Sequence, residues 1–367
     1  MNSLVFSNML HRPARTAVSV VGIGVGILLI VFTVGLANGS LRERAQREAN
    51  VGAEIMFRAS GSRGLSGSEA LRLPVSKRSD LSSIAGVESV VPIAQNSVAA
   101  SDTNTGSRLI DGVDLDDYSR ISGLQIVKGR GFTPGTSEAI CDAAWLAQKR
   151  LSVGAKISLY EREFELVGVY EPSVGARVKI PLDTMQTQLG GEGLASAFLI
   201  KIKPGESEDQ VAARIHERFP DNQILLTRDL EELYMQGFPA LNVFLNVVIG
   251  VAGVISALII LLTMYTTVTE RTRQIGVLKS LGMSNFKIAW TIVQEALLIG
   301  VGGVLFGVLA TVVLRYVLAQ WTTLTVQIEP SVVGSILLVG LLSSIVGALY
   351  PGLRAARLDA VEALSYE

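Results

Sequence analysis

Four aspartates, Asp111, Asp114, Asp116 and Asp117, lie close together in the sequence. Carboxylate oxygens are the ligands that Ca²⁺ prefers in proteins, so the cluster raises the question of a calcium site. Its spacing lacks the central glycine and the terminal glutamate of an EF-hand loop. We therefore interpret the cluster as a solvated acidic loop.

The other side chains that could do chemistry are few and scattered. The two histidines, His11 and His216, are far apart, which argues against a transition-metal site. Cys141 is the single cysteine, so no intrachain disulfide can form. The sequence contains no G-x-S-x-G, no H-E-x-x-H and no G-x-x-x-x-G-K-[ST] loop to cradle ATP. It therefore predicts no enzyme, metal or cofactor on this chain.

The composition indicates a membrane protein. Of the 367 residues, 49% are hydrophobic and 18% are charged, whereas soluble domains carry about 25% charged residues. The missing charge is concentrated in four apolar runs that are long enough to span a bilayer, which takes about 20 helical residues. The formal net charge of −1 gives no general attraction to nucleic acid.

The first apolar run could also be a cleaved signal peptide. Such peptides have an apolar region of only about 7–15 residues, so we favour a retained helix. Gly22 and Gly26 lie within this run, and Gly303 and Gly307 lie within the third. Small residues at this spacing are typical of close contacts between membrane helices. A dinucleotide-binding loop is the weaker interpretation of Gly22 and Gly26, because no strand precedes them.

The segment between the first two apolar runs has the composition of a soluble α+β domain. Strands are predicted at residues 54–57, 87–93, 107–113, 155–160, 164–169, 197–202 and 223–226, and helices at 77–85, with Ser76 as its cap, and 206–219. The helix-then-strand unit occurs twice, which predicts two small lobes with a β-rich insertion between them. Charged helical segments on both sides of the domain are predicted to be stalks that lead to and from the membrane.

A short polar segment, ERTRQIGVLKSLGMSNFK, separates the second and third apolar runs. Ile275, Leu278 and Leu281 recur at three-residue spacing, which predicts a short helix with one apolar face, and Gly282 is a stop signal. Its excess of Lys and Arg favours the cytosolic side. Two interpretations remain open: the apolar face docks a cytosolic partner, or the helix lies on the lipid headgroups.

Four motifs then resemble one family. Residues 270–284 resemble the cytosolic coupling helix of the MacB/FtsX-like ABC transporter permeases. The sequence from Pro351 through Arg354 and Arg357 to Leu364 resembles the C-terminal P-x-x-R-A-A-R-L-D-P-V-E-A-L of that family, with Ala360 in place of the usual proline. Arg12-Pro-x-Arg15-Thr16 is a weaker similarity, and Gly129-Arg130-x-Phe132 resembles the family's G-R-x-F.

The resemblance implies a permease subunit without a fused ATPase, so that ATP and Mg²⁺ would be bound by a separate partner subunit. Its fold would be four transmembrane helices with a large extracytoplasmic α+β domain, a MacB-like periplasmic domain, between helices 1 and 2. The residues that would couple to an ATPase are Glu270, Arg271, Arg273, Ile275, Gly276, Leu278, Lys279, Leu281 and Gly282. Glu295 resembles an acidic position of the family, and we expect it to contact the coupling helix or a partner subunit.

The predicted segments are an N-terminal interfacial helix (1–15), transmembrane helices (16–40, 240–269, 288–318 and 332–353), stalks (41–51 and 228–239), the extracytoplasmic domain (52–227), the coupling helix (270–287), an external loop (319–331) and a cytosolic tail (354–367). Both termini are expected in the cytosol of a bacterium, with the chain in the inner membrane. The short loops agree, since residues 319–331 hold no Lys or Arg.

The family implies ATPase subunits in two copies, a second permease subunit, membrane lipid and, in some systems, a periplasmic adaptor and an outer-membrane channel. Efflux of a hydrophobic compound or peptide and export of a lipoprotein or lipid are both open. The alternative function is an FtsX-like relay that activates an external cell-wall hydrolase without transport. A sensor or scaffold without an ATPase would leave the coupling motif unexplained.

Overall fold

The computed structural model of the chain describes residues 13–61, 71–99, 107–237, 239–319 and 326–359. The chain forms two compact units, which we describe separately. The helical unit comprises residues 1–39 and 239–367, and the globular unit comprises residues 40–238. Helix α2 begins in the helical unit and ends in the globular unit.

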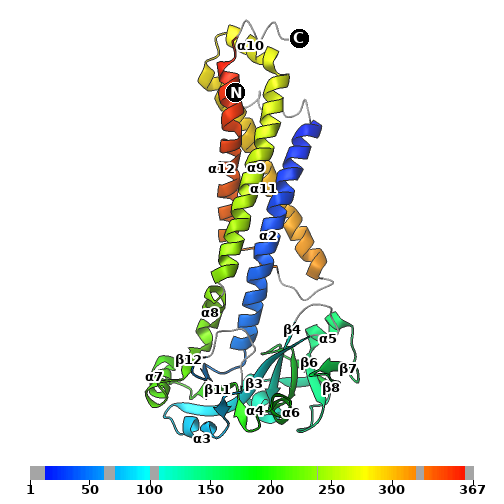
Figure 1. Cartoon of the computed structure of the whole chain (residues 1–367), viewed down its shortest axis with the longest axis vertical. Helices are drawn as coiled ribbons and strands as arrows, with labels where there is room; N and C mark the ends of the chain where they lie inside the picture. Colours follow the sequence, from blue (N-terminus) through cyan, green and yellow to red (C-terminus); the bar gives the residue numbers. More distant parts are fainter. Residues whose placement is uncertain (1–12, 62–70, 100–106, 238, 320–325, 360–367) are drawn as a thin grey trace. The chain divides into compact units, whose positions relative to one another are not determined.

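Among the described residues, four helices are long and apolar enough to cross a membrane. They are α2 (Pro13–Ala49), α9 (Pro239–Glu270), α11 (Asn285–Ala319) and α12 (Pro330–Arg357), and the short helix α10 (Thr272–Ser280) lies between α9 and α11. Each predicted span falls inside one of the four, and the prediction of four transmembrane helices is confirmed. The long helices run side by side (Figure 1).

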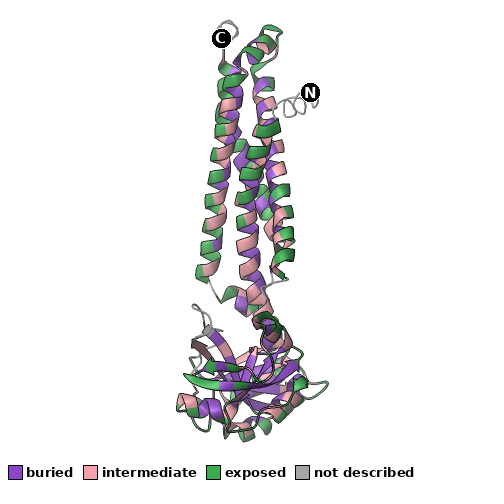
Figure 2. Cartoon of the chain, turned by 90° about the vertical axis from the view of Figure 1, so that its right-hand side faces the viewer, coloured by how far each residue is buried: buried purple, intermediate pink, exposed green. Residues whose placement is uncertain are grey.

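The helical unit has one apolar core, to which all four long helices and α10 contribute side chains. Many large apolar side chains of these helices are exposed. Figure 2 shows exposed segments along the length of the long helices. Leu258 of α9, for example, is 58% exposed. An apolar outer surface is what a helix bundle surrounded by lipid requires.

The globular unit is built on a ten-stranded mixed sheet with the order β12-β1-β11-β3-β4-β9-β6-β8-β5, where β7 pairs with β8. The strands are β1 (Ile55–Arg58), β3 (Val87–Ala99), β4 (Ser107–Val113), β5 (Gln125–Gly129), β6 (Glu138–Asp142), β7 (Lys156–Leu159), β8 (Arg162–Glu171), β9 (Val178–Pro181), β11 (Ala197–Ile202) and β12 (Gln223–Leu226). β2 (Leu73–Pro74) and β10 (Leu194–Ala195) form a separate pair. The helices are α3 (Lys77–Ser82), α4 (Leu115–Ser122), α5 (Ala143–Lys149), α6 (Leu182–Leu189), α7 (Glu208–Arg218), the 3₁₀ turn η1 (Thr227–Asp229) and α8 (Leu230–Gln236).

The prediction of two lobes is wrong. Leu81 of α3 and Val211 and Ile215 of α7 share one buried cluster with β1, β3 and β11. β1 and β11 lie between β12 and β3, so both helix-then-strand units pack on the same part of one continuous sheet. Ser76 is at the N-cap of α3, but its side chain makes no capping hydrogen bond, contrary to our expectation.

The strands predicted at residues 155–160 and 164–169 are present as β7 and β8, which pair antiparallel and form a hairpin. Its turn lies at Tyr160 and Glu161, and both residues have positive φ (53° and 59°). Two consecutive residues with positive φ are the signature of a type I′ turn, whose twist matches that of the flanking strands.

Several predictions fall wholly or partly outside the described residues. They are the interfacial helix up to residue 12, residue 238 of the second stalk, residues 320–325 of the external loop and residues 360–367 of the tail. From Pro13 onward the chain belongs to α2.

Candidate functional site

The coupling segment, residues 270–287, contains the short helix α10 between the end of α9 and the start of α11. α9 ends at Glu270, Arg271 is the N-cap of α10, and Leu281 is the C-cap. Gly282 follows with φ of +88°. Its amide donates to the carbonyl of Lys279 (2.9 Å), and the amide of Met283 donates to that of Leu278 (3.0 Å). These two bonds are a Schellman motif, which explains why a glycine ends the helix here.

The apolar face of α10 differs from the predicted one. Ile275 is only 8% exposed, because it packs into the core of the helical unit, and Leu278 is half-buried. The exposed large apolar side chains of the segment are Val277 (43%), Leu281 (79%) and Phe286 (75%). Of the three residues of the predicted apolar face, only Leu281 is therefore largely exposed.

A mainly apolar groove lies beside α10. It has a volume of about 370 Å³ and is lined by the end of α9, by α10 and by the start of α11. Val277, Leu278 and Ile288 are among its apolar walls, and Arg271 and Glu295 are its charged side chains. The groove therefore lies between the coupling segment and the two membrane helices that flank it in the sequence, α9 and α11.

Charged side chains connect the start of this segment to α2 and α11. Arg15 of α2 pairs with Glu270, and its guanidinium donates to the Thr267 hydroxyl (3.4 Å). Arg271 Nη1 lies 3.5 Å from Glu295 Oε2, and the Glu295 side chain is 8% exposed. The expectation that Glu295 contacts the coupling segment is therefore met within this chain.

The end of α10 contacts the end of α12. Lys279 Nζ donates to the carbonyls of Ala356 (2.7 Å) and Leu358 (2.6 Å). The last carbonyls of a helix have no partner within it and carry partial negative charge, so a lysine is a favourable cap. Lys279 was predicted to contact an ATPase, and the structure gives it this intramolecular role.

The C-terminal motif also packs within the bundle. Pro351 is buried inside α12, and the Arg354 guanidinium lies 4.7 Å from the ring centre of Tyr265 on α9. Of the remaining predicted residues, Gly276 is buried against the bundle, whereas Arg273 and Arg357 are exposed.

The predicted glycine contacts need a correction. A Cβ at Gly26 would meet no atom within 4 Å, and one at Gly22 would meet only Ile259 at 3.9 Å. Gly303 and Gly307 lie against α2, and a Cβ at Gly307 would approach the carbonyl oxygen of Gly24 to 2.7 Å. The close approach of α2 to Gly303 and Gly307 is therefore at Gly24, which is not one of the predicted glycines.

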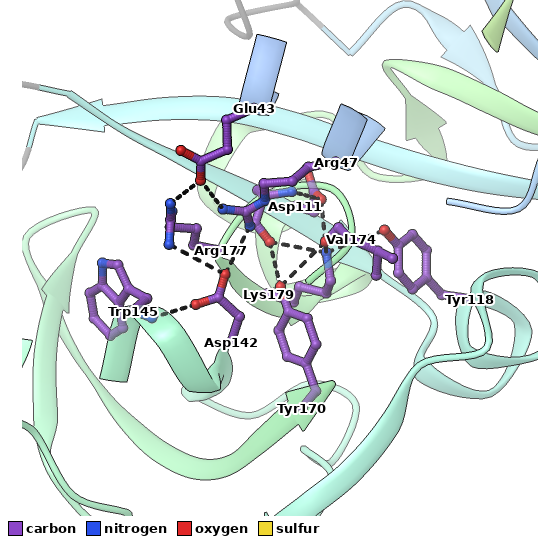
Figure 3. A network of polar contacts seen from close by, with 11 residues as sticks. Glu43, Arg47, Asp111, Tyr118, Asp142, Trp145, Tyr170, Val174, Arg177 and Lys179 are labelled. Carbon is purple, nitrogen blue, oxygen red and sulfur yellow. Dashed lines mark hydrogen bonds and ion pairs between the residues drawn. The ribbon is translucent and has the colours of Figure 1, made fainter. Parts of the chain in front are cut away.

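A second polar site, which sequence reasoning missed, lies in the globular unit where α2 ends (Figure 3). Asp142 is fully buried, and its Oδ2 lies 3.1 Å from Arg47 Nη2 and 3.7 Å from Arg177 Nη1. Arg177 also pairs with Glu43, one helical turn before Arg47. The other oxygen of Asp142 accepts from the amide of Trp145 (2.6 Å) and caps α5. We call Glu43, Arg47, Asp142 and Arg177 the stalk joint.

Lys179 is the centre of the neighbouring contacts in Figure 3. It is fully buried, and its ammonium donates to Asp111 Oδ2 (3.0 Å) and to the carbonyls of Val174 (2.9 Å) and Ala176 (3.1 Å). Burial lowers its pKa, and the charge of Asp111 opposes that change. A lysine between Val178 and Ile180 in an otherwise apolar strand is the sequence signal that could have identified this site.

The interpretation of the aspartate cluster as a solvated acidic loop is wrong. Asp111 is buried in β4, and Asp116, although exposed, lies with Asp117 in α4. Asp111 pairs with Lys179, Asp114 caps α4 by accepting from the amide of Asp117, and Asp117 pairs with Arg78 and Arg120. Among the described residues, no group of three His, Cys, Asp or Glu side chains could hold a metal ion.

Two family models match this chain. Residues 16–218 match the MacB-like periplasmic core domain, and residues 246–360 match the FtsX-like permease C-terminal region.

The chain is also similar to known proteins along almost its whole length. It is 23% identical to the uncharacterized ABC transporter permease YknZ of Bacillus subtilis, over 99% of this chain and 98% of that one. It is 25% identical to the macrolide export ATP-binding/permease protein MacB of Campylobacter jejuni over 99% of this chain, but it spans 61% of that relative's length. Among solved structures, the periplasmic region of MacB from Actinobacillus actinomycetemcomitans covers 51% of this chain and 95% of its own at 18% identity, with a TM-score of 0.38.

The first family model alone matches more than half of the sequence. The chain therefore belongs to the MacB/FtsX-like family of ABC transporter permeases, with four transmembrane helices and an extracytoplasmic α+β domain between the first and the second.

Proposed function

We propose that this chain is the permease subunit of an ABC transporter. In this proposal a separate ATPase, present in two copies, binds to the coupling segment, and ATP hydrolysis moves the extracytoplasmic domain by mechanotransmission. A second permease subunit of the same kind completes the transporter. Both termini are cytosolic, and the chain resides in the inner membrane of a bacterium.

The observation that carries the proposal is the set of contacts around the coupling segment. Leu281 and Phe286 present exposed apolar surface to a partner, while Glu270 contacts α2, Arg271 contacts α11 and Lys279 contacts α12. A displacement of this segment is therefore delivered to every other membrane helix. A helix that merely lay on lipid headgroups would not need these connections.

The names of the relatives support export as the outcome. MacB is named for macrolide export, and a relative from Pseudomonas putida, PvdT, is named for pyoverdine export at 21% identity. We propose that the cargo is a hydrophobic compound, a peptide, or a lipoprotein or lipid, and that an adaptor and an outer-membrane channel take part where the cell has an outer membrane. These relatives support export over activation of a cell-wall hydrolase.

The proposal is tested by purifying the tagged full chain from its native membrane after chemical crosslinking and identifying the bound proteins by mass spectrometry. We expect an ABC ATPase among them. A Leu281→Glu chain serves as the matched control and should recover less ATPase at equal permease yield. Recovery of no ATPase with the unmodified chain would contradict the proposal.

A further inference from the structure

We infer that the stalk joint is the point at which movement of α2 enters the extracytoplasmic domain. This inference rests on the proposed function, because it concerns how the domain receives the movement. It assigns a positioning role to Arg47, Asp142 and Arg177, none of which belongs to the coupling segment.

The stalk joint fixes the end of α2 in one register relative to the domain. Asp142 is fully buried and Arg47 is 9% exposed, so a movement of α2 relative to the domain would leave a buried charge without its partner. Such a loss costs about 3–5 kcal/mol, whereas well-packed apolar residues in place of a buried ion pair often stabilise a protein equally well. One helical residue corresponds to about 1.5 Å along the axis, which is enough to break a 3.1 Å contact. Buried charge is therefore better suited to holding α2 in place than to maximising stability.

The stalk joint is connected to the central strands of the sheet. The amide of Gly175 donates to the carbonyl of Arg47 (2.8 Å), which lies in the last turn of α2. Gly175 has no space for a side chain, since a Cβ there would lie 2.5 Å from Asp111 Oδ2. Lys179 holds the same loop through the carbonyls of Val174 and Ala176 and is itself part of β9. Because β9 pairs with both β4 and β6, a displacement of Arg47 reaches the central strands directly.

Helix α8, which precedes α9 in the sequence, contacts the same stretch of α2 that carries the stalk joint. The Tyr234 hydroxyl of α8 donates to Glu48 (2.6 Å), and Arg42 pairs with Glu231 (2.9 Å). Ala45, Leu230 and Tyr234 form a small apolar cluster between the two helices. The end of α2 and α8 therefore move as one body, and the stalk joint connects this body to the sheet.

The test compares two variants of the full chain in complex with its ATPase. Arg177→Met removes the contacts to Glu43 and Asp142, and Arg130→Met is the matched control, because it removes an exposed arginine–carboxylate pair with Glu138 elsewhere in the domain. Hydrogen exchange is measured by mass spectrometry with and without a non-hydrolysable ATP analogue. In the unmodified chain and in Arg130→Met we expect the nucleotide to change exchange both in residues 270–287 and in residues 171–181.

In Arg177→Met we expect the nucleotide effect, that is, the change in hydrogen exchange caused by the ATP analogue, to persist in residues 270–287 and to be lost in residues 171–181. Persistence of both effects in this variant would overturn the inference and leave the proposed function intact. Absence of both effects in the unmodified chain would overturn the proposed function and the inference with it. Unchanged basal exchange in the central strand β11 shows that the variant is folded.

A crosslink separates loss of the joint from loss of structure. Glu43→Cys with Arg177→Cys is treated with a reducible bifunctional thiol reagent. Burial raises the pKa of the only native thiol, Cys141, to about 12, so it does not compete. We expect the nucleotide effect in residues 171–181 to return when the two cysteines are linked and to disappear on reduction. An effect that stays absent in the linked protein would contradict the inference.

Discussion

The coupling segment and the stalk joint use opposite chemistry. At the coupling segment, Leu281 and Phe286 are largely exposed, and the Arg15–Glu270 pair is partly exposed. At the stalk joint, Asp142 and the adjacent Lys179 are fully buried. Exposed apolar surface suits a contact that forms with a partner, and buried charge suits a contact that must keep one register. The comparison separates the part of the chain that receives movement from the part that passes it on.

The largest effect is expected at the buried lysine next to the joint. Lys179→Met leaves Asp111 buried without its partner and should lower the free energy of unfolding of the domain by about 3–5 kcal/mol. Denaturant unfolding of a full chain in which Trp290 and Trp321 are replaced by Phe, followed by the fluorescence of Trp145, measures this change. Lys179→Met with Asp111→Leu removes both charges and should be less damaging than the single change. Equal stability of Lys179→Met and the unmodified chain would show that the buried charges do not hold this region.

The next largest effect is expected where α2 and α11 touch. Gly307→Ala should destabilise the helical unit by about 1–3 kcal/mol, because its Cβ would lie 2.7 Å from both the Gly24 oxygen and Ile27 Cβ. Gly26→Ala is the matched control, since that position is open and an alanine in a helix is favoured by about 0.5–1 kcal/mol. Thermal unfolding in detergent should rank Gly307→Ala below the unmodified chain and Gly26→Ala at or above it. The reverse order would mean that our assignment of the contact glycine is wrong.

A smaller effect is expected at the exposed apolar surface. Leu281→Glu should weaken ATPase binding by about 1–2 kcal/mol, roughly ten-fold in dissociation constant, because an exposed leucine loses its burial in the interface. Its thermal unfolding should be unchanged. Ile275→Glu should instead destabilise the helical unit, since Ile275 is buried in the core. If both changes affected stability alone, the distinction between exposed and buried faces of α10 would carry no functional meaning.

The smallest effect is expected at the exposed ion pair used as a control. Hydrogen bonding to Arg130 lowers the pKa of Glu138 from 4.5 to about 2. A lowered carboxylate pKa contributes stability that is present above the unfolded value and is lost as pH falls from 4.5 toward 2. Arg130→Met should therefore lower the thermal midpoint slightly at neutral pH, and the difference should disappear in strong acid. A pH-independent difference would assign the effect to packing.

The regular elements could be predicted from the sequence because each depends on local pattern. β4, β11 and β12 have the predicted bounds, and the uncharged runs locate the membrane helices. The ending of α10 followed from Gly282 alone, since a Schellman motif needs a positive φ at that position.

The sites depend on tertiary contacts that no local pattern records. Ile275 and Leu281 belong to the same periodic stripe, yet one is buried and the other is exposed. Arg47, Asp142 and Arg177 come from three separate segments, and the long-range sheet pairing brings them together. Gly22 and Gly26 matched a packing motif, but the orientation of α2 placed Gly24 in the contact.

The central claim is that a separate ATPase binds the exposed apolar surface of the coupling segment. The most direct measurement is site-specific photo-crosslinking in native membranes from position 281, with position 258, on the exposed face of α9, as the matched comparison. The account predicts an ATPase adduct from position 281 and none from position 258. An ATPase adduct at neither position, or equal yields at both, would contradict it.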